Sequence, residues 1–158
     1  MSKYYIAYGS NMKTSDMKKR CPNAKVVGKF ILPNYRLVFN RYATIFEDNN
    51  SSVPTVVWKI SDEDEKLLDV YEGFPKLYRK ETIALSVNKK KVEAMIYIMN
   101  DFVPHPPTKE YFNIILSSYK EFGFSTDNLK EALVSTISID EFYDEELCTE
   151  FVKTYFYE

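Results

Sequence analysis

Short apolar runs separated by polar turn residues dominate the first hundred residues of the chain, and their lengths predict strands rather than helices. The run Lys3–Tyr8 is rich in aromatic and aliphatic residues and stops at Gly9, as a buried strand that ends in a turn does. The polar segment Glu47–Ser52 is predicted to be a loop between strands. Further strands are predicted at Ala24–Leu32, Tyr35–Asn40, Tyr42–Phe46, Pro54–Ile60, Tyr78–Val87 and Lys91–Met99.

Helices are predicted where apolar residues fall at helical spacing behind a capping residue. Ser61 is the predicted N-cap of the first long helix, with Asp64 in the capping-box position and Gly73 as the C-terminal stop. A second helix runs from Thr108 to about Phe122 and ends at Gly123. The other predicted helices are a short polar one ending at Arg20 with N-cap candidates Thr14, Ser15 and Asp16, and two near the C-terminus at Thr126–Val134 and Ile139–Tyr155.

The strands lie in the middle of the chain and the helices bracket them, without regular alternation of strand and helix. This order favours an α+β fold with a curled sheet or small barrel over a doubly wound fold. The length of 158 residues fits a single domain.

Composition removes several classes of function. One histidine, His105, and two separated cysteines, Cys21 and Cys148, leave little for a metal cluster or a histidine-based triad, so we expect no metal. A net charge of −2 argues against nucleic-acid binding. We also expect no membrane association, because no apolar stretch reaches about 18–20 residues. Because the sequence shows no CxxC pair and no signal peptide, we expect the two cysteines to be reduced and the protein to be cytoplasmic.

The turn at Tyr8-Gly9-Ser10-Asn11-Met12 is the first candidate for chemistry. A glycine there allows a positive φ or the close approach of a ligand, and successive amides can point at one oxygen atom. The alternative is an ordinary turn between a strand and a helix. The segment is not a phosphate loop, because it has neither the length nor the lysine of one.

Glu72 is the second candidate. It stands at the predicted end of a helix, before Gly73, with Tyr71, Phe74 and Leu77 around it. The helix dipole and apolar neighbours both disfavour a charged carboxylate there, so a buried Glu72 would have a raised pKa suited to acid/base work. The alternative is an exposed glutamate in the last helical turn.

Other conspicuous residues have plainer interpretations. His105 lies in a proline-rich loop, and Lys89–Lys91 is read as a solvated hairpin tip. The aromatic residues of Tyr111–Phe124 are interpreted as core rather than as a stacking platform for bases. Those of Phe142–Tyr157 either cover the core or mediate a homodimer.

Several motifs in one order resemble the γ-glutamylcyclotransferase family, also called AIG2-like. The residues Tyr5-Ile6-Ala7-Tyr8-Gly9-Ser10-Asn11-Met12 resemble its opening YxAYGSN strand and turn. The matching segments that follow are Ala43–Phe46, Val56–Lys59, Leu68–Gly73 with its LDxxEG pattern, Tyr78, Pro106–Tyr111 and Glu121–Phe124.

The resemblance implies a small mixed β-barrel flanked by helices and a reaction that needs no cofactor. The substrate would be a small γ-glutamyl compound whose own α-amino group attacks its γ-carbonyl, which gives 5-oxoproline and a free amine. Glu72 would be the catalytic acid/base. The substrate-binding residues would be Tyr5, Ile6, Ala7, Tyr8, Gly9, Ser10, Asn11, Tyr78 and Tyr111.

Two segments depart from the family pattern. The stretch from Asn40 to Ala43 lacks the glycine-rich lead-in that commonly precedes the next strand. The resemblance covers a core of about residues 3–135, whereas a helical extension at about 136–158 has no matching motif. The departures leave the substrate open among glutathione-like peptides, γ-glutamyl amino acids and γ-glutamylated amines. The alternative function is a non-catalytic module that binds a small molecule or a protein and retains the same fold.

Overall fold

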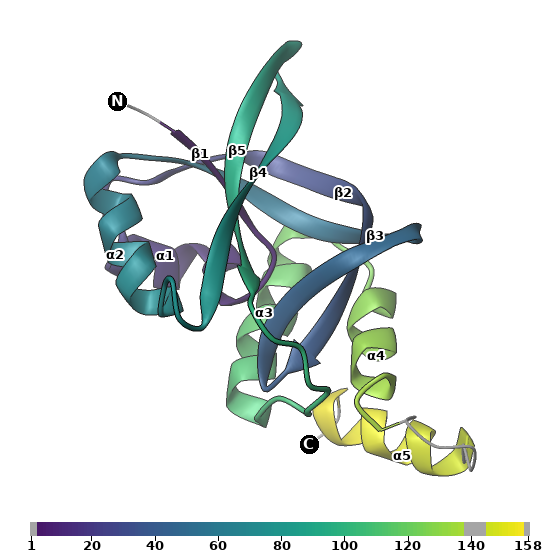
Figure 1. Cartoon of the computed structure of the whole chain (residues 1–158). Coiled ribbons are helices and arrows are strands. Elements are labelled where there is room, and N and C mark those ends of the chain that lie inside the picture. The colour runs from purple at the N-terminus through teal and green to yellow at the C-terminus, as the bar shows by residue number, and fades with distance from the viewer. Residues whose placement is uncertain (1–2, 138–144, 157–158) are drawn as a thin grey trace.

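A computed structural model describes residues 3–137 and 145–156 of the chain. Its centre is a five-stranded sheet in the order β2-β3-β1-β5-β4 (Figure 1). The middle strand β1 (Lys3–Ala7) pairs antiparallel with β3 (Tyr42–Ile60) and parallel with β5 (Lys90–Met99). The outer strands are β2 (Lys25–Asn40) and β4 (Tyr78–Val87). The turn that follows β1 therefore starts at the middle of the sheet.

Strands β2 and β3 form one long hairpin, where the sequence predicted four shorter strands and a loop. They turn at Arg41, which has a positive φ of 63°. The register of the pair shifts between Pro33 and Tyr35, and Asn34 adopts a φ of 66° there. This bulge accommodates both the proline and the polar segment Glu47–Ser52, which lies within β3 and not in a separate loop. The prediction was wrong here because the turn residues bend the strands without ending them.

The long predicted helices begin and end where their capping signals place them. Helix α2 (Asp62–Glu72) has the complete capping box of Ser61 and Asp64, and Gly73 follows it with a φ of 67°. Helix α3 (Lys109–Phe122) is capped by the Thr108 side chain, which accepts from the Tyr111 amide at 3.2 Å.

The remaining helices are shorter. Helix α1 (Thr14–Arg20) has Lys13 at its N-cap and no side-chain cap, so none of the three predicted candidates caps it. Helices α4 (Asp127–Val134) and α5 (Glu145–Phe156) follow α3. The predicted start of the last helix at Ile139 lies outside the described residues.

The sheet and helices confirm the α+β prediction, with the barrel description holding only loosely. The ladder does not close, because β2 and β4 are its two outer strands and do not pair with each other in the described chain. Helices α1 and α2 lie at one side of β1, while α3, α4 and α5 gather beside the β2–β3 hairpin (Figure 1). No helix within residues 3–137 or 145–156 has the length and apolar character needed to cross a membrane.

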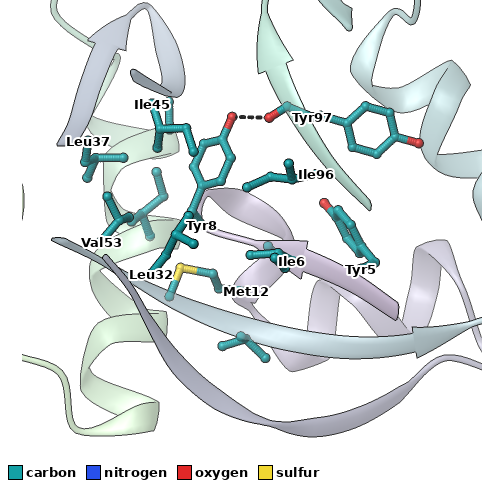
Figure 2. Packing of buried hydrophobic residues seen from close by; sticks show 14 of the residues in the cluster. Tyr5, Ile6, Tyr8, Met12, Leu32, Leu37, Ile45, Val53, Ile96 and Tyr97 are labelled. Atoms are coloured by element: carbon teal, nitrogen blue, oxygen red, sulfur yellow. Dashed lines mark hydrogen bonds between the residues drawn. The ribbon is translucent and has the colours of Figure 1, made fainter. Parts of the chain in front are cut away.

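One apolar core joins the sheet to the helices. Figure 2 shows the part of this core that surrounds Tyr8, with residues from β1, β2, β3 and β5. Phe112 of α3 is fully buried, and the rings of Tyr155 and Phe156 from α5 pack edge-on against it at 4.9 and 5.5 Å. Tyr155 and Phe156 therefore cover the core, which is the first of the two roles considered for the C-terminal aromatic residues, whereas Phe142, Tyr143 and Tyr157 lie outside the described residues.

Candidate active site

A cavity of about 240 Å³ opens where the turn after β1 meets the end of α2. Five structural segments contribute to it: β1 with its turn, the start of β3, the end of α2, the β4–β5 pair and α3. The lining residues are Tyr5, Ile6, Tyr8, Gly9, Ser10, Asn11, Tyr42, Ala43, Tyr71, Glu72, Leu77, Tyr78, Tyr97 and Tyr111.

The site residues predicted from the sequence come together in this cavity, with the exception of Ala7. Ala7 is buried, pairs with Val56 on β3 and does not line the cavity. Sequence reasoning missed Tyr42, Ala43, Tyr71, Leu77 and Tyr97 as lining residues. Tyr71 and Leu77 were visible as neighbours of Glu72, but nothing in the local sequence places Tyr97 there, because it enters from β5.

The turn after β1 is held in place from behind. Residues Ser10–Met12 form a single 3₁₀ turn, η1, and the Trp58 indole donates to the Asn11 carbonyl at 3.0 Å. Gly9 has a φ of −119°, so it does not supply the positive φ considered for it. The glycine is needed because the turn has little room for a side chain: a Cβ at Gly9 would lie 3.3 Å from both the Ala43 Cβ and the Tyr111 hydroxyl oxygen. The turn thus packs tightly against the far wall of the cavity.

Glu72 is the last residue of α2, and its carboxylate faces the turn. Its Oε1 accepts a hydrogen bond from the Asn11 side-chain Nδ2 at 3.2 Å. Burial raises the pKa of Glu72 to about 7, while the positive charge of Arg20 acts in the opposite direction. A carboxyl group with this pKa can both take up and release a proton near neutral pH.

Tyrosine hydroxyls make up much of the polar wall. Tyr8 donates to the Tyr97 carbonyl at 2.5 Å (Figure 2), and Tyr78 donates to the Ala43 carbonyl at 2.7 Å. Tyr78 therefore donates its hydroxyl proton to the backbone and not to Glu72. By contrast, Tyr111 accepts from the Ala43 amide at 3.0 Å and Tyr5 accepts from Asn11 Nδ2 at 2.9 Å, so both keep a proton to donate.

Burial keeps these hydroxyls neutral. It raises the pKa of every tyrosine in the set well above its ordinary value, so each acts as a hydrogen-bonding group and not as an anion. The set comprises Tyr5, Tyr8, Tyr78, Tyr97 and Tyr111.

Comparison with known proteins identifies the family. The model of the family described as "Gamma-glutamyl cyclotransferase, AIG2-like" matches residues 5–119, which include every residue that lines the cavity. The chain belongs to this family. Relatives named gamma-glutamylcyclotransferase include one from Bos taurus, 28% identical over 141 residues, covering 80% of this chain and 75% of the relative. Another, from Homo sapiens, is 29% identical over 133 residues, covering 75% and 71%.

A solved structure shows that the family fold extends beyond the matched segment. A protein named gamma-glutamyl cyclotransferase superimposes with a TM-score of 0.74 and 24% identity, covering 98% of this chain and 99% of its own. The described helices α4 and α5 thus fall within the length over which the two chains correspond.

The departure from the family motif at Asn40–Ala43 lies at the cavity mouth. Arg41 makes the hairpin turn, and Tyr42 follows as a half-exposed lining residue whose ring packs edge-on against Tyr111 at 5.3 Å. His105 lies outside the cavity and is exposed. Within the described residues, no group of three or more histidine, cysteine, aspartate or glutamate side chains is arranged to hold a metal ion.

Proposed function

We propose that this protein cyclises a γ-glutamyl amide to 5-oxoproline and a free amine, with Glu72 as general acid/base. The observation that carries the proposal is the placement of Glu72. Its carboxyl group, with a pKa of about 7, lines the same cavity as the Gly9–Asn11 turn in a chain of this family. The nucleophile belongs to the substrate, so the reaction needs no serine, cysteine or metal from the protein.

The steps balance with a single proton carrier. Ionised Glu72 takes a proton from the substrate α-ammonium group, and the freed amine attacks the γ-carbonyl carbon to form the ring C–N bond. Glu72 then gives this proton to the leaving nitrogen, the tetrahedral intermediate collapses and the original amide C–N bond breaks. The ring nitrogen loses its second proton to Glu72, which passes that proton to the released amine and is ionised again. Positioned proton transfers of this kind typically contribute about 10²–10⁴-fold to the rate.

Neutral donors would stabilise the charges of substrate and intermediate. Glu72 is the charged residue among those that line the cavity, so an α-carboxylate or an oxyanion would meet hydroxyls and amides. Tyr5 and Tyr111 have hydroxyl protons that no described acceptor uses, and the first amides of η1 face no partner within their own turn. Losing one such donor costs about 10²–10³ in kcat in a comparable oxyanion site.

The cavity would also hold the substrate in a folded shape. An extended glutamyl chain keeps its amine far from its γ-carbonyl, and binding in a near-attack geometry removes much of that entropic cost. The mouth is apolar and partly exposed, with Tyr42, Tyr71 and Leu77 at 48%, 44% and 42% of full exposure. We therefore propose that leaving amines with an apolar portion are preferred over strongly charged ones.

Further proposals concern the location, the cofactor requirement and the assembly of the protein. Two free, buried cysteines, Cys21 and Cys148, fit a reducing cytoplasmic location. The mechanism above uses no cofactor. A homodimer stays a prediction, and so does the single-domain assignment for residues 1–158.

The test is a panel of γ-glutamyl amides that differ in the leaving amine, with 5-oxoproline measured as product. The wild type should release 5-oxoproline from at least one compound, and Glu72→Gln, which keeps the shape but cannot carry the proton, should lower kcat by at least about 10²-fold. Glu63→Gln, at an exposed position on the same helix, is the matched control. Equal turnover by Glu72→Gln would refute the mechanism. Binding of these compounds without turnover by the wild type would instead favour a binding module.

A further inference from the structure

Arg20 lies outside the cavity but contacts two of its walls. It is the last residue of α1, and its guanidinium donates a hydrogen bond to the Asn11 side-chain oxygen. The same group stacks on the Tyr71 ring, 3.6 Å from the ring centre. The Tyr71 hydroxyl in turn shares a hydrogen bond with Ser10 at 2.8 Å. Arg20 thus joins the turn after β1 to the end of α2.

The Asn11 amide has two orientations that differ only by exchange of its oxygen and nitrogen. A guanidinium has donors and no acceptor, so it accepts only the orientation in which the amide oxygen faces Arg20. The amide nitrogen then points the other way, toward Glu72 Oε1 at 3.2 Å and the Tyr5 hydroxyl oxygen at 2.9 Å. If the amide were flipped, its NH₂ group would face the N–H donors of Arg20, and its oxygen would face the carboxylate oxygen of Glu72.

We propose that Arg20 is a positioning residue: it holds the Asn11 amide so that its NH₂ group faces Glu72 and Tyr5. This rests on the function proposed above. The NH₂ group then supports the ionised form of Glu72, which must take up the substrate proton. It also occupies a lone pair of Tyr5, which leaves the hydroxyl proton of Tyr5 for the substrate.

The charge of Arg20 acts in the same direction. Burial disfavours ionised Glu72, and Arg20 opposes this by lowering the pKa of Glu72. On β4, Lys80 is held by Asp69 of α2 at 3.0 Å and by Glu65 at 2.6 Å. The other titratable groups that line the cavity are tyrosines from β1 and its turn, β3, α2, β4, β5 and α3, namely Tyr5, Tyr8, Tyr42, Tyr71, Tyr78, Tyr97 and Tyr111.

The test compares Arg20→Met and Arg20→Lys with Lys19→Met in the full-length protein. Lys19 is exposed and adjacent on α1, so its substitution removes the same charge without touching Asn11. The titration of Glu72 is followed by carbon-13 NMR of the glutamate side chains, with its signal assigned by its loss in Glu72→Gln. The pH profile of kcat/KM is measured on a γ-glutamyl amide that the wild type cyclises.

We expect Arg20→Met to raise the pKa of Glu72 above the value of about 7 in the wild type and to move the acidic limb of kcat/KM to higher pH. At pH 6 the loss in kcat/KM should be about tenfold. Arg20→Lys keeps a cation and should leave the pKa of Glu72 lower than Arg20→Met does. Lys19→Met should match the wild type in both measurements.

The route through Asn11 is tested by a double-variant cycle. If Arg20 acts through this amide, Arg20→Met should lower kcat less in an Asn11→Ala background than in the wild type, whereas independent effects would add. An unchanged Glu72 titration in Arg20→Met, or the same loss of activity at every pH, would overturn the proposal. If the wild type releases no 5-oxoproline, the proposed function fails, but the NMR titration still decides the role of Arg20.

Discussion

Replacing Glu72 by glutamine is expected to stabilise the folded protein at alkaline pH while removing its activity. Glu72 has a raised pKa because it is buried, so the folded state holds the proton more tightly than the unfolded chain does. As the pH rises from about 4.5, the unfolded chain ionises first, and the folded state loses stability until Glu72 itself ionises near pH 7. Glutamine has the same shape and does not titrate.

The size of the effect follows from the displaced pKa. A change from 4.5 to about 7 corresponds to about 3 kcal/mol of unfolding free energy at high pH. About 2.5 kcal/mol of this develops between pH 5 and pH 8.5. Glutamine can still accept the hydrogen bond from Asn11 through its amide oxygen, so the substitution leaves no donor unpaired at that contact.

Urea unfolding at pH 5 and pH 8.5 measures the effect directly. The stability of Glu72→Gln relative to the wild type should increase by about 2.5 kcal/mol between the two pH values, and any pH-independent effect of the substitution cancels in this comparison. Glu63→Gln, at an exposed position on the same helix, provides the control. An increase below about 0.5 kcal/mol would refute the assignment of a buried, proton-holding Glu72, and with it the physical basis for the acid/base role.

Three further predictions concern the walls of the cavity and the core behind it. Tyr78→Phe removes the donor to the Ala43 carbonyl and should cost about 1–3 kcal/mol in urea unfolding; no loss would contradict the hydrogen bond. Gly9→Ala places a Cβ 3.3 Å from the Tyr111 hydroxyl, so kcat/KM should fall at least about tenfold with a stability loss of about 1–3 kcal/mol, and wild-type kinetics would count against this packing. Burial raises the pKa of Cys21 to about 11, so iodoacetamide at pH 8 should label it only in urea, as judged by mass spectrometry; rapid labelling of the native protein would show that the thiol is accessible.

Local signals in the sequence were enough to locate the catalytic candidate. Ser61 and Asp64 fix the start of α2, and Gly73 fixes its end, so the position of Glu72 in the last turn follows from capping chemistry alone. The apolar run of β1 likewise predicts where the turn at Gly9 begins.

The partners of the site residues could not be predicted in this way, because they depend on packing between distant segments. Tyr78 lines the cavity as expected of a substrate-binding residue, but its hydroxyl donates to the Ala43 carbonyl, a partner 35 positions away that no local pattern predicts. Tyr97 carries no local signal, since its position follows from the parallel pairing of β5 with β1. The bulge at Asn34 depends on the partner strand in the same way.

The cavity has a consequence for how activity is acquired during folding. Its hydrogen bonds join residues far apart in the chain: Ser10 to Tyr71, Tyr8 to Tyr97 and Ala43 to Tyr111 are separated by 61, 89 and 68 positions. Such long-range closures come late, because the entropy of each intervening loop must be lost before the contact forms. A chain that has regained its helices and its hairpin therefore still lacks a catalytic site. Release of 5-oxoproline during refolding would record the completion of tertiary structure, which circular dichroism at helical wavelengths does not distinguish.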